Sequence, residues 1–577
     1  MAAFLELSVM KKNAGIIICS FVAVLAVVWA SFSFSEHRGS LSEMETELFS
    51  KSESSVQNES SEEATLPEEV VMFTPHATEN TDPGKFGLQT EIYSGDTKID
   101  KYSLPGFYFG TENNYSALDG IITFRGNNFR DSAVFGTAKL EKKNFEDTWQ
   151  VETGSLPSGS GYPAWTGSGW TGQPLIVKWD KETRQHMNMY EEKKAKEDLV
   201  EVIFATMSGT IYFIDLEDGS LTRDSLDLGF TFKGAGALDP RGYPIMYVGA
   251  GDYNPSGTSP KMFIINLLDC SIMKEYSGAD SAAHRTWCAF DSSPLVCAST
   301  DTLVYPCENG LIYNIRLNSN YDKENGTLTI NPEEPIKLKV TTARSNATNY
   351  WYGFETSAVI YGEYMYIADN GGYLYCINMT TLEVIWMQDV VDDTNCSPVL
   401  EKEGDKVYIY ISTSLHWTQA GGRGDIPVFK IDAETGEIVW QQNFNCSTIP
   451  DTSGGVQGTL ALGKNDCADL IFVPLAHYPN NFRGGVAALR KDTGEQVWYY
   501  NGTNYTWSSP VVVTGADGNS VVINADVSGE VVMLDAKTGE LIRKITPGSL
   551  IEASPAVYND MLVLGLRNQK IKGIKLS

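Results

Sequence analysis

Residues suited to metal and redox chemistry are scarce in this sequence. Its 577 residues include nine cysteines and six histidines. No two cysteines are adjacent and none form a Cys-x-x-Cys pair, which argues against a zinc site. The histidines are too few and too scattered for a metal cluster. A glycine-rich phosphate loop and a nucleophile elbow are also missing, so the signatures of nucleotide-binding enzymes and serine hydrolases are absent.

Positive charge is also in short supply. The chain has 44 lysines and arginines against 73 aspartates and glutamates, a formal net charge of −29. This balance argues against nucleic-acid binding, which needs basic surface against the phosphates. An acidic surface keeps an exported protein soluble, and recruitment of cations or basic partners is the alternative interpretation.

Long apolar runs are missing apart from one near the N-terminus. Residues 15–34 are almost entirely apolar and follow Lys11 and Lys12. A run of about 20 residues suits one bilayer crossing, and basic residues before it predict a cytoplasmic N-terminus. We therefore expect residues 1–14 in the cytoplasm, residues 15–34 as a transmembrane signal anchor, and the rest of the chain exported to the outer side of the cell membrane. Cleavage after Ala30 is the alternative, and would release the protein.

The segment that follows the apolar run is acidic and rich in serine and glutamate. Residues 35–84 contain few aromatic residues, and stretches such as Glu59-Ser60-Ser61-Glu62-Glu63 are typical of it. Such a composition cannot bury enough apolar surface to order itself. The sequence therefore predicts a disordered tether that holds the following domain away from the membrane.

A nine-residue phrase recurs through the rest of the chain at intervals of roughly 40–60 residues, which is typical of a repeat architecture. Its clearest copy is Asp-Ala-Glu-Thr-Gly-Glu-Ile-Val-Trp at 432–440. Two further strong copies and three weaker ones occur at 490–498, 535–543, 378–386, 215–223 and 266–274.

Each copy of the phrase has the pattern of a β-hairpin. An apolar strand such as Val531–Leu534 precedes it, the phrase itself supplies a polar turn with glycine, and a short strand ending in tryptophan follows. Upstream of several copies, a Ser-Pro pair such as Ser397-Pro398 begins another strand, where proline costs no ladder hydrogen bond. Four antiparallel strands per repeat predict an all-β protein, the blades of a β-propeller.

The phrases indicate eight blades within residues 144–577. We place them at 170–228, 234–277, 287–340, 353–390, 395–444, 455–501, 507–546 and from 551 onward. The eighth ends at Ser577, before its outermost strand. The segment Thr148–Gly154 contains Trp149 where the tryptophan of a phrase would stand, so we expect it to complete blade eight and close the ring. The third phrase is poor, and seven blades remain the alternative.

The phrase and the Ser-Pro strand starts resemble those of the pyrroloquinoline-quinone-like (PQQ-like) propeller repeat family, over about Asn144 to Ser577. The family includes quinoprotein alcohol and sugar dehydrogenases and cofactor-free scaffolds, such as the propeller lipoprotein of outer-membrane assembly. The resemblance implies that the phrase tryptophans pack between blades, here Trp149, Trp386, Trp440 and Trp498. Arg223, Lys274 and Arg543 take that position in weaker copies, and we expect those interfaces to tolerate substitution better.

A lead-in segment at 85–143 precedes the first blade. Its residues Ile121 to Asp131 include Phe124-Arg125-Gly126, which resembles the Phe-Arg-Gly entry segment of the same family. We expect this segment to pack on one rim of the propeller.

The family's quinone chemistry needs an aromatic floor, a Ca²⁺ or Mg²⁺ ion held by carboxylate or amide oxygens, and an aspartate base. Many of its dehydrogenases add a vicinal disulfide, which this chain lacks. Carboxylates such as Asp369, Asp393, Asp451 and Asp526 match no metal-ligand motif, and turn or cap roles explain them. We expect no cofactor, catalytic residue or metal ligand. Cys288, Cys297 and Cys307 fall in one blade, where a disulfide and small buried thiols are both open.

Two loops in successive blades share one pattern: a histidine, an aromatic residue, and an Arg-Gly pair before the apolar strand. Gly- and aromatic-rich loops of this kind predict a binding surface, while two similar loops packing on each other are the alternative. The candidate binding residues are His416, Trp417, Arg423, His477, Tyr478 and Arg483.

These observations predict a membrane-anchored extracytoplasmic propeller that binds a protein or glycan partner and catalyses no reaction. A dehydrogenase that uses pyrroloquinoline quinone with Ca²⁺ is one alternative, and an envelope-assembly scaffold is another. Nucleic acid is not an expected partner.

Overall fold

The computed structural model describes residues 73–170, 172–345, 352–416, 422–450 and 452–577. The predicted cytoplasmic segment, the predicted anchor at 15–34, most of the predicted tether and Trp417 lie outside this range. No helix within the described ranges is long and apolar enough to cross a membrane. Residues Val71–Ser577 form one compact unit.

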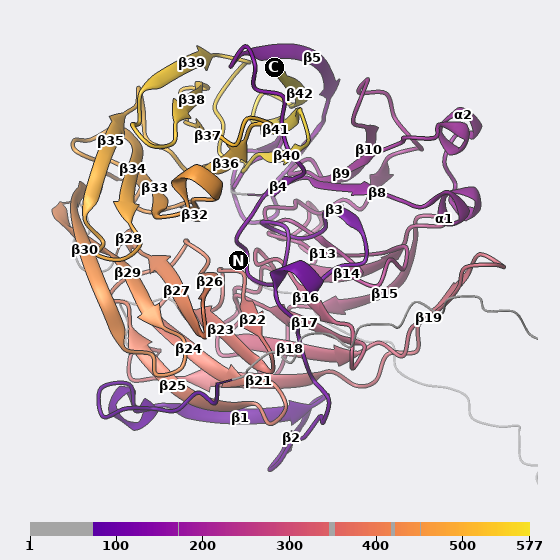
Figure 1. Cartoon of the computed structure of the whole chain (residues 1–577). Helices are drawn as coiled ribbons and strands as arrows, with labels where there is room; N and C mark the ends of the chain where they lie inside the picture. The colour runs from indigo at the N-terminus through magenta and orange to yellow at the C-terminus, as the bar shows by residue number, and fades with distance from the viewer. Residues whose placement is uncertain (1–72, 171, 346–351, 417–421, 451) are drawn as a thin grey trace, which may run out of the picture. The chain divides into compact units, whose positions relative to one another are not determined.

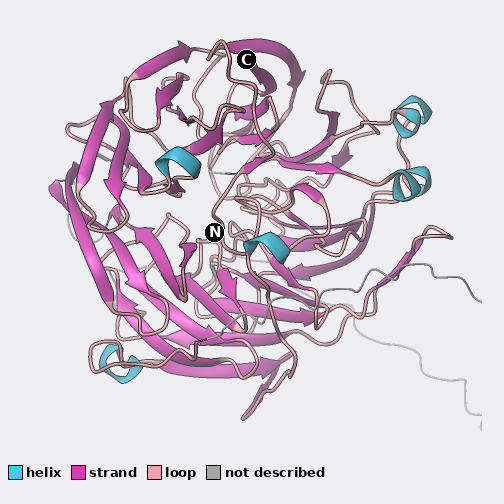
Figure 2. Cartoon of the chain, in the orientation of Figure 1, coloured by secondary structure: helices cyan, strands magenta, loops and turns pink. Residues whose placement is uncertain are grey.

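This unit is an eight-bladed β-propeller of four-stranded antiparallel blades, as predicted (Figure 1). In each blade the first strand lies towards the middle of the ring and the last at its rim. Within the described residues, helix is limited to five short segments (Figure 2): η1 (Pro83–Phe86), η2 (Glu112–Asn114), α1 (Lys181–His186), α2 (Glu191–Ala195) and η3 (Asn465–Cys467).

The strands of the first four blades, each given from the inside outward, are as follows. Blade one has β8 (Leu175–Lys178), β9 (Glu201–Ala205), β10 (Thr210–Asp215) and β11 (Leu226–Asp227). Blade two has β12 (Ala237–Leu238), β13 (Ile245–Gly249), β14 (Lys261–Asn266) and β15 (Ser271–Ser277). Blade three has β16 (Leu295–Cys297), β17 (Thr302–Pro306), β18 (Leu311–Arg316) and β21 (Ile336–Thr341). Blade four has β22 (Val359–Tyr361), β23 (Tyr364–Ala368), β24 (Tyr373–Asn378) and β25 (Glu383–Asp389).

The remaining four blades follow the same order. Blade five has β26 (Val399–Glu403), β27 (Lys406–Ser412), β29 (Arg423–Asp432) and β30 (Ile438–Ser447). Blade six has β32 (Ala461–Leu462), β33 (Leu470–Ala476), β34 (Gly484–Arg490) and β35 (Gln496–Asn501). Blade seven has β36 (Val511–Thr514), β37 (Ser520–Ala525), β38 (Val531–Asp535) and β39 (Leu541–Ile545). Blade eight has β40 (Ala556–Tyr558), β41 (Met561–Leu566), β42 (Lys570–Leu576) and β5 (Phe145–Glu152).

Ten further strands lie outside the four-stranded blades. β1 (Gln89–Ser94) and β2 (Thr97–Ile99) extend the outer edge of blade three to six strands. The others are β3 (Asp119–Ile121) on β8, β4 (Val134–Phe135) on β40, the hairpins β6 (Ser155–Leu156) with β7 (Trp165–Thr166) and β19 (Asn320–Asp322) with β20 (Thr327–Thr329), and β28 (Ser414–Leu415) with β31 (Gly454–Gly455) in the sheet of blade six.

The N-terminal strand β5 closes the ring. It pairs antiparallel with β42, from Phe145 opposite Leu576 to Glu152 opposite Lys570. The predicted closure is confirmed, although the strand begins three residues before the predicted segment 148–154. Because β42 would otherwise present unpaired N–H and C=O groups, this pairing removes the open edge of blade eight.

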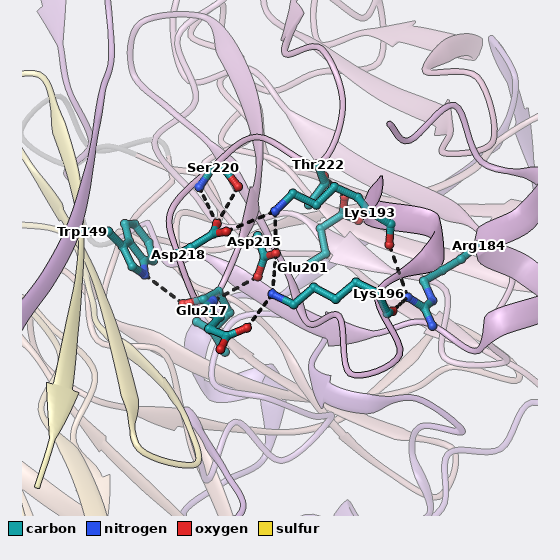
Figure 3. Close-up of polar contacts among 11 residues, drawn as sticks. Trp149, Arg184, Lys193, Lys196, Glu201, Asp215, Glu217, Asp218, Ser220 and Thr222 are labelled. Atoms are coloured by element: carbon teal, nitrogen blue, oxygen red, sulfur yellow. Dashed lines mark hydrogen bonds and ion pairs between the residues drawn. The ribbon is translucent and has the colours of Figure 1, made fainter. Parts of the chain in front are cut away.

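The four phrase tryptophans join blade eight to one, four to five, five to six and six to seven. The indole Nε1 of Trp440 donates to Lys491 O at 2.8 Å, the second residue of the following phrase. Trp149, Trp386 and Trp498 make the same contact with Leu216 O, Ala433 O and Ala536 O. Figure 3 shows the contact at Trp149, where the turn from Asp215 to Ser220 is also held by Lys193 and Lys196. We call this contact the interblade seam.

The glycine of the phrase is required by the same seam. Gly436 has φ of 73°, and a Cβ at this position would lie 2.6 Å from the Trp386 ring. Gly494 and Gly539 stand in the same relation to Trp440 and Trp498. The tryptophan therefore requires the glycine, because the indole ring packs where the side chain of any other residue would lie.

The weak copy of the phrase in blade one changes our expectation about substitution. Arg223 is fully buried, its guanidinium pairs with Glu201 at 2.7 Å, and it donates to Leu267 O at 2.5 Å. Leu267 O is the acceptor that a tryptophan would use in this seam, so arginine replaces tryptophan in the same role. Lys274 and Arg543, in contrast, are exposed.

The Phe-Arg-Gly segment does not pack on a rim. Residues 119–138, which we call the plug, run past the inner strands of the propeller. The plug contacts an inner element of every blade. In blades one to four, β3 pairs with β8, Leu238 N donates to Ile122 O, Thr123 Oγ1 donates to Pro294 O, and Ile360 N donates to Asn128 O. In blades five to eight, Leu400 N donates to Phe129 O, Lys464 pairs with Asp131, Ala138 N donates to Thr514 O, and β4 pairs with β40.

Two buried arginines fasten the plug. Arg130 is 0% exposed and donates to Ala358 O, Phe124 O and Ser293 O, at 3.1, 2.8 and 2.9 Å. Arg125 donates to Arg130 O and to Pro510 O, both at 3.1 Å. Burial lowers the pKa of Arg125 to about 10 and that of Arg130 to about 9. Both guanidinium groups remain charged at neutral pH, and main-chain carbonyl dipoles replace their water.

The Ser-Pro strand starts, together with Ser357 and Thr459 at the same position in their blades, form a series of hydroxyl groups around the plug. In each case a backbone N–H of one blade donates to the hydroxyl oxygen of the next, at 2.9–3.2 Å. The series runs from blade three to blade eight through Ser293, Ser357, Ser397, Thr459, Ser509 and Ser554. Serine and threonine are needed here because the acceptor must reach a neighbouring main chain at close range.

The two arginines at equivalent seam positions give a direct test. We expect Arg223→Met to lower the free energy of unfolding by about 3–5 kcal/mol, because it leaves Glu201 buried and unpaired. Arg543→Met, at the same position of an exposed copy, should change it by less than about 0.5 kcal/mol. Urea denaturation of the full-length protein measures both, and equal losses would show that Arg223 does not act as the seam residue.

Candidate functional site

The predicted binding loops of blades five and six pack against each other. Arg423 donates to Asn445 Oδ1 at 3.0 Å and, across the seam, to Pro479 O at 2.9 Å. His416 is half-buried, and its Nδ1 lies 3.0 Å from Ser453 Oγ. Burial lowers the pKa of His416. Trp417 lies outside the described residues.

The second loop is held in the same way. His477 is fully buried, its Nδ1 accepts from Phe482 N at 3.0 Å, and its ring lies 4.6 Å from that of Tyr505. Tyr478 packs edge-on against Phe444 and Tyr499. Arg483 donates to Thr503 O at 3.2 Å in the blade-seven loop. The structure thus brings the two loops together, with most of their side chains engaged in packing, and their binding role stays a prediction.

The structure places a funnel nearby, at one end of the plug. Its walls come from blades one to seven, and Phe124 of the plug forms part of the lining. Its free interior is about 20 Å³, and the space rises to about 440 Å³ only when the solvent at its open mouth is included. Trp170 and Trp507 face each other across this funnel, with ring centroids 5.3 Å apart and planes inclined at 37°. The other lining residues are Gly234, Ala235, Asp291, Ser293, Glu355, Ser357, Asn395, Ser397, Gln457 and Thr459.

These lining residues follow a sequence pattern that the nine-residue phrase and the candidate loops did not include. In five successive blades, the residue two positions before the serine or threonine of the hydroxyl series lies in the funnel wall: Asp291, Glu355, Asn395, Gln457 and Trp507. In extended chain, residues two apart lie on the same side. The residue two positions before each of these hydroxyl residues could therefore have been identified from the sequence as part of the lining of one shared site.

Carboxylates gather at the funnel floor around blades three to five. Glu308 is buried, and accepts from Trp287 Nε1 at 2.9 Å. Asp393 accepts from Asn370 Nδ2 at 2.9 Å, and the same amide donates to Glu355 Oε2 at 3.2 Å. Burial raises the pKa of Asp393 to about 8 and that of Glu308 well above its usual range. Burial also raises the pKa values of Asp291 and Glu355.

A buried lysine stands beside these carboxylates. Lys233 is 4% exposed, and its Nζ lies 3.5 Å from Asp291 Oδ2. The same ammonium lies 5.0, 4.8 and 5.3 Å from the ring centroids of Trp165, Trp170 and Trp287. Three tryptophan faces and one carboxylate therefore stabilise a positive charge at this point.

We tested these residues against the quinone and metal that the fold family implies. Two rings that sandwich a flat cofactor must stand about 7 Å apart, twice a carbon contact distance of roughly 3.5 Å, whereas Trp170 and Trp507 are already in contact at 5.3 Å. A flat tricarboxylate would also face Asp291 and Glu355. Within the described residues, no group of three or more histidine, cysteine or carboxylate side chains is arranged for a metal. The funnel residues do not fit this cofactor.

The eight described cysteines are all free thiols, seven of them buried. Cys288, Cys297 and Cys307 each lie within blade three without pairing. The sequence left open a disulfide or small buried thiols for these three cysteines, and the structure supports the buried thiols.

The pKa of His477 gives a prediction about pH. Burial lowers it to about 4, so the folded chain keeps this imidazole neutral over a range in which the unfolded chain, with a pKa near 6.5, takes up a proton. Protonation of His477 in the unfolded chain therefore lowers the free energy of unfolding as the pH falls from about 6.5 to about 4. His477→Asn keeps an acceptor for Phe482 N and tolerates the left-handed φ of 53°. Its unfolding free energy, measured in urea, should fall less over that range than that of the unchanged protein, and parallel pH profiles would contradict the assignment.

Comparison with known proteins supports the fold. The family model described as "Outer membrane protein assembly factor BamB" matches residues 352–501 and 482–574, which span blades four to eight. No curated protein matches the chain in sequence.

Among solved structures, a quinohemoprotein alcohol dehydrogenase from Pseudomonas putida HK5 is 11% identical, covers 79% of this chain and 80% of its own, and has a TM-score of 0.53. A europium-containing methanol dehydrogenase (11% identity, 77% and 89% coverage) and the quinohemoprotein alcohol dehydrogenase from Comamonas testosteroni (12%, 79% and 80%) both have TM-scores of 0.51. At such identities the likeness shows the fold alone. The repeated phrase and the matched blades are similar to those of the PQQ-like β-propeller repeat family.

Proposed function

We propose that this propeller is a non-catalytic binding module on the extracytoplasmic side of the cell membrane, and that the mouth of its axial funnel binds a glycan partner. The observation that carries the proposal is the pair Trp170 and Trp507, whose rings meet across a funnel that is otherwise lined by hydroxyl, amide and carboxylate groups. Saccharides are bound by this combination, because an aromatic face packs on the C–H face of a sugar while polar side chains bond its hydroxyls.

The free interior of the funnel, about 20 Å³, is far smaller than the roughly 300–1,000 Å³ of a pocket that encloses a small ligand. A glycan would therefore contact the open mouth, where Trp170 and Trp507 meet, without entering the funnel. A protein partner would instead need a broad surface of about 800 Å² on each side.

Attachment to the membrane is part of the same proposal. It rests on the apolar run at 15–34 with Lys11 and Lys12 before it, and on the acidic tether that follows. A propeller held at a distance from the membrane by about 50 extended residues would be able to reach polymers of the cell envelope.

Two other functions remain as alternatives. The family model's description favours an envelope-assembly scaffold, which would bind membrane proteins. Co-purification of membrane proteins from the envelope, in place of saccharide, would support that scaffold role. A quinone-dependent dehydrogenase is the other alternative, suggested by the fold of the solved relatives.

Glycan capture is tested with one funnel variant and two controls. We expect the full-length protein to retain envelope saccharides in a pull-down, and Trp507→Ala to lose at least about tenfold in affinity while its melting temperature stays close to that of the unchanged protein. Phe482→Ala, which removes a 59% exposed aromatic residue outside the funnel lining, should bind normally. Loss of binding with Trp417→Ala but not with Trp507→Ala would move the site to the predicted loops.

The dehydrogenase alternative is tested by stability. A ligand that binds only the native state must raise the melting temperature as its concentration rises. We expect no rise on adding pyrroloquinoline quinone with Ca²⁺, since the funnel residues do not fit it. A concentration-dependent rise, together with dye-linked oxidation of an alcohol or sugar, would overturn the non-catalytic assignment.

A further inference from the structure

A segment that precedes the first blade lies on the rim of blades four and five. Residues 73–88, which we call the strap, include η1 and the end of the predicted tether. η1 packs against β25 of blade four, in the indigo segment that precedes β1 in Figure 1. The residues before η1 bond to the phrase turn of blade five. The strap therefore crosses the interblade seam that Trp386 makes between these two blades.

Main-chain groups on both sides of this seam bind the strap. On the turn of blade five, His76 N donates to Glu434 O at 2.9 Å, and Thr81 Oγ1 donates to Thr435 O at 2.7 Å. On blade four, Met387 N donates to Thr81 O at 3.0 Å. The blades contribute only backbone atoms to these contacts, so another seam with the same backbone can make them too.

One side chain of the turn adds to these contacts. The carboxylate of Glu437 accepts from Thr78 Oγ1 and from Asn80 Nδ2, the latter at 3.2 Å. Hydrogen bonds to an ionised acceptor are stronger than those between neutral groups. The strap thus presents hydroxyl and amide donors in the order Thr-x-Asn-Thr, from Thr78 to Thr81, to one carboxylate and one main-chain carbonyl.

The next seam, between blades five and six, repeats the geometry of the turn. Trp440 packs on Gly494 as Trp386 packs on Gly436, and the two glycines have φ of 75° and 73°. In both turns the glycine N–H donates to the carbonyl of the first phrase residue at 2.8 Å. In both, the N–H of the phrase glutamate lies 3.2–3.3 Å from the threonine Oγ1.

The outer strand at the second seam also has the same register. Gln441 follows the tryptophan and lies opposite Phe429, as Met387 lies opposite Tyr375, with the same β-bulge beside each pair. The N–H of Gln441 therefore points away from β29, as that of Met387 points away from β24 to the strap. Since β30 is the outermost strand of its sheet, this donor faces outward at an open edge of the described chain.

The acceptors of the second seam are not used by any described residue. They are Asp492 O, Thr493 O and the carboxylate of Glu495, and no hydrogen bond from the described part of the chain reaches them. Thr493 and Glu495 are exposed, whereas Thr435 and Glu437, which the strap contacts, are only half-buried in place of exposed. The strap's partners at seam four–five thus have unused equivalents at seam five–six.

Apolar side chains at the two seams differ in the same way. Val384 of β25, the strand that η1 lies against, is 8% exposed. The equivalent Ile438 of β30 is 37% exposed, and Val439 beside it is 48% exposed. A segment bound at seam five–six would remove these side chains from water. Seam six–seven has Gln496 at this position, so seam five–six is the better match to the one that the strap occupies.

We propose that the seam between blades five and six is a docking surface for a segment of a partner protein that carries hydroxyl and amide side chains in the order Thr-x-Asn-Thr. The side-chain donors of that segment bind the Glu495 carboxylate and Thr493 O, and its main chain accepts from Gln441 N. None of these residues lines the funnel, so this surface is separate from the one proposed for a glycan.

The chain supplies its own probe, a fluorescent peptide of residues 73–85. We expect the peptide to bind the full-length protein saturably in an anisotropy titration. Glu495→Ala should weaken this binding at least about tenfold, because the acceptor of two charge-assisted hydrogen bonds is removed. A peptide with alanine in place of Thr78, Asn80 and Thr81 should not bind, which tests the same contacts without a change in the protein.

Glu383→Ala is the matched control. Glu383 is an exposed carboxylate at the same phrase position in blade four, where Leu382 stands in place of the turn glycine, and its removal should leave peptide binding unchanged. Absence of binding, or equal affinity for the Glu495→Ala protein, overturns the inference. Loss of binding with Glu540→Ala alone overturns the choice of seam. Dimers of the protein that dissociate with Glu495→Ala would make a second copy the occupant and overturn the assignment to a separate partner.

Discussion

Two guanidinium groups without a carboxylate partner hold the centre of this propeller. Arg125 and Arg130 are buried on the axis, and among the described residues they bond to main-chain carbonyls and one hydroxyl, from the plug itself and from blades three, four and seven. A guanidinium has five N–H donors in a rigid plane, so it can bridge strand ends that converge from several directions. Eight sheets packed around an axis leave just such a set of carbonyls at their inner ends.

The plug also explains what the funnel is. Because residues 119–138 fill the space inside the inner strands, the axis is not an open channel, and the side chain of Phe124 becomes part of a closed-ended site. Arg125 and Arg130 both adopt left-handed backbone conformations, with φ of 52° and 58°. Each costs on the order of 1–2 kcal/mol, so the surrounding blades must impose the shape of the plug.

The seams show how one geometric requirement can be met by different residues. At five of them a long side chain donates to the second residue of the next phrase. Tryptophan meets the requirement at four seams, and at each its ring packs on the glycine of the next phrase: Gly219, Gly436, Gly494 and Gly539. Arg223 meets it with a charged group, at the cost of burying Glu201 as its partner. The repeat therefore keeps the same contact while its residues vary within a single chain.

The eight-bladed fold, the closure by a strand near Trp149 and the tryptophan seams follow from the sequence, because each depends on local patterns: alternating strands, a glycine turn, and a missing final strand. The position of Arg223 could not be read in this way, since its partners Glu201 and Leu267 lie on other strands. The loops around His416 and His477 were visible as a shared pattern, yet only the tertiary structure shows that Arg423 reaches Pro479 and that most of their side chains are packed.

The funnel was hidden for a physical reason. Its walls come from seven blades, so Trp170, Asp291, Glu355 and Trp507 are separated by many residues along the chain and meet only when the ring closes. The sequence alone determined that the chain forms blades and favoured eight of them over seven. Which side chains converge on the axis, and that a buried lysine with three tryptophans stands among the carboxylates there, was decided by the tertiary structure, because convergence on one axis is a property of the closed ring and of no single repeat.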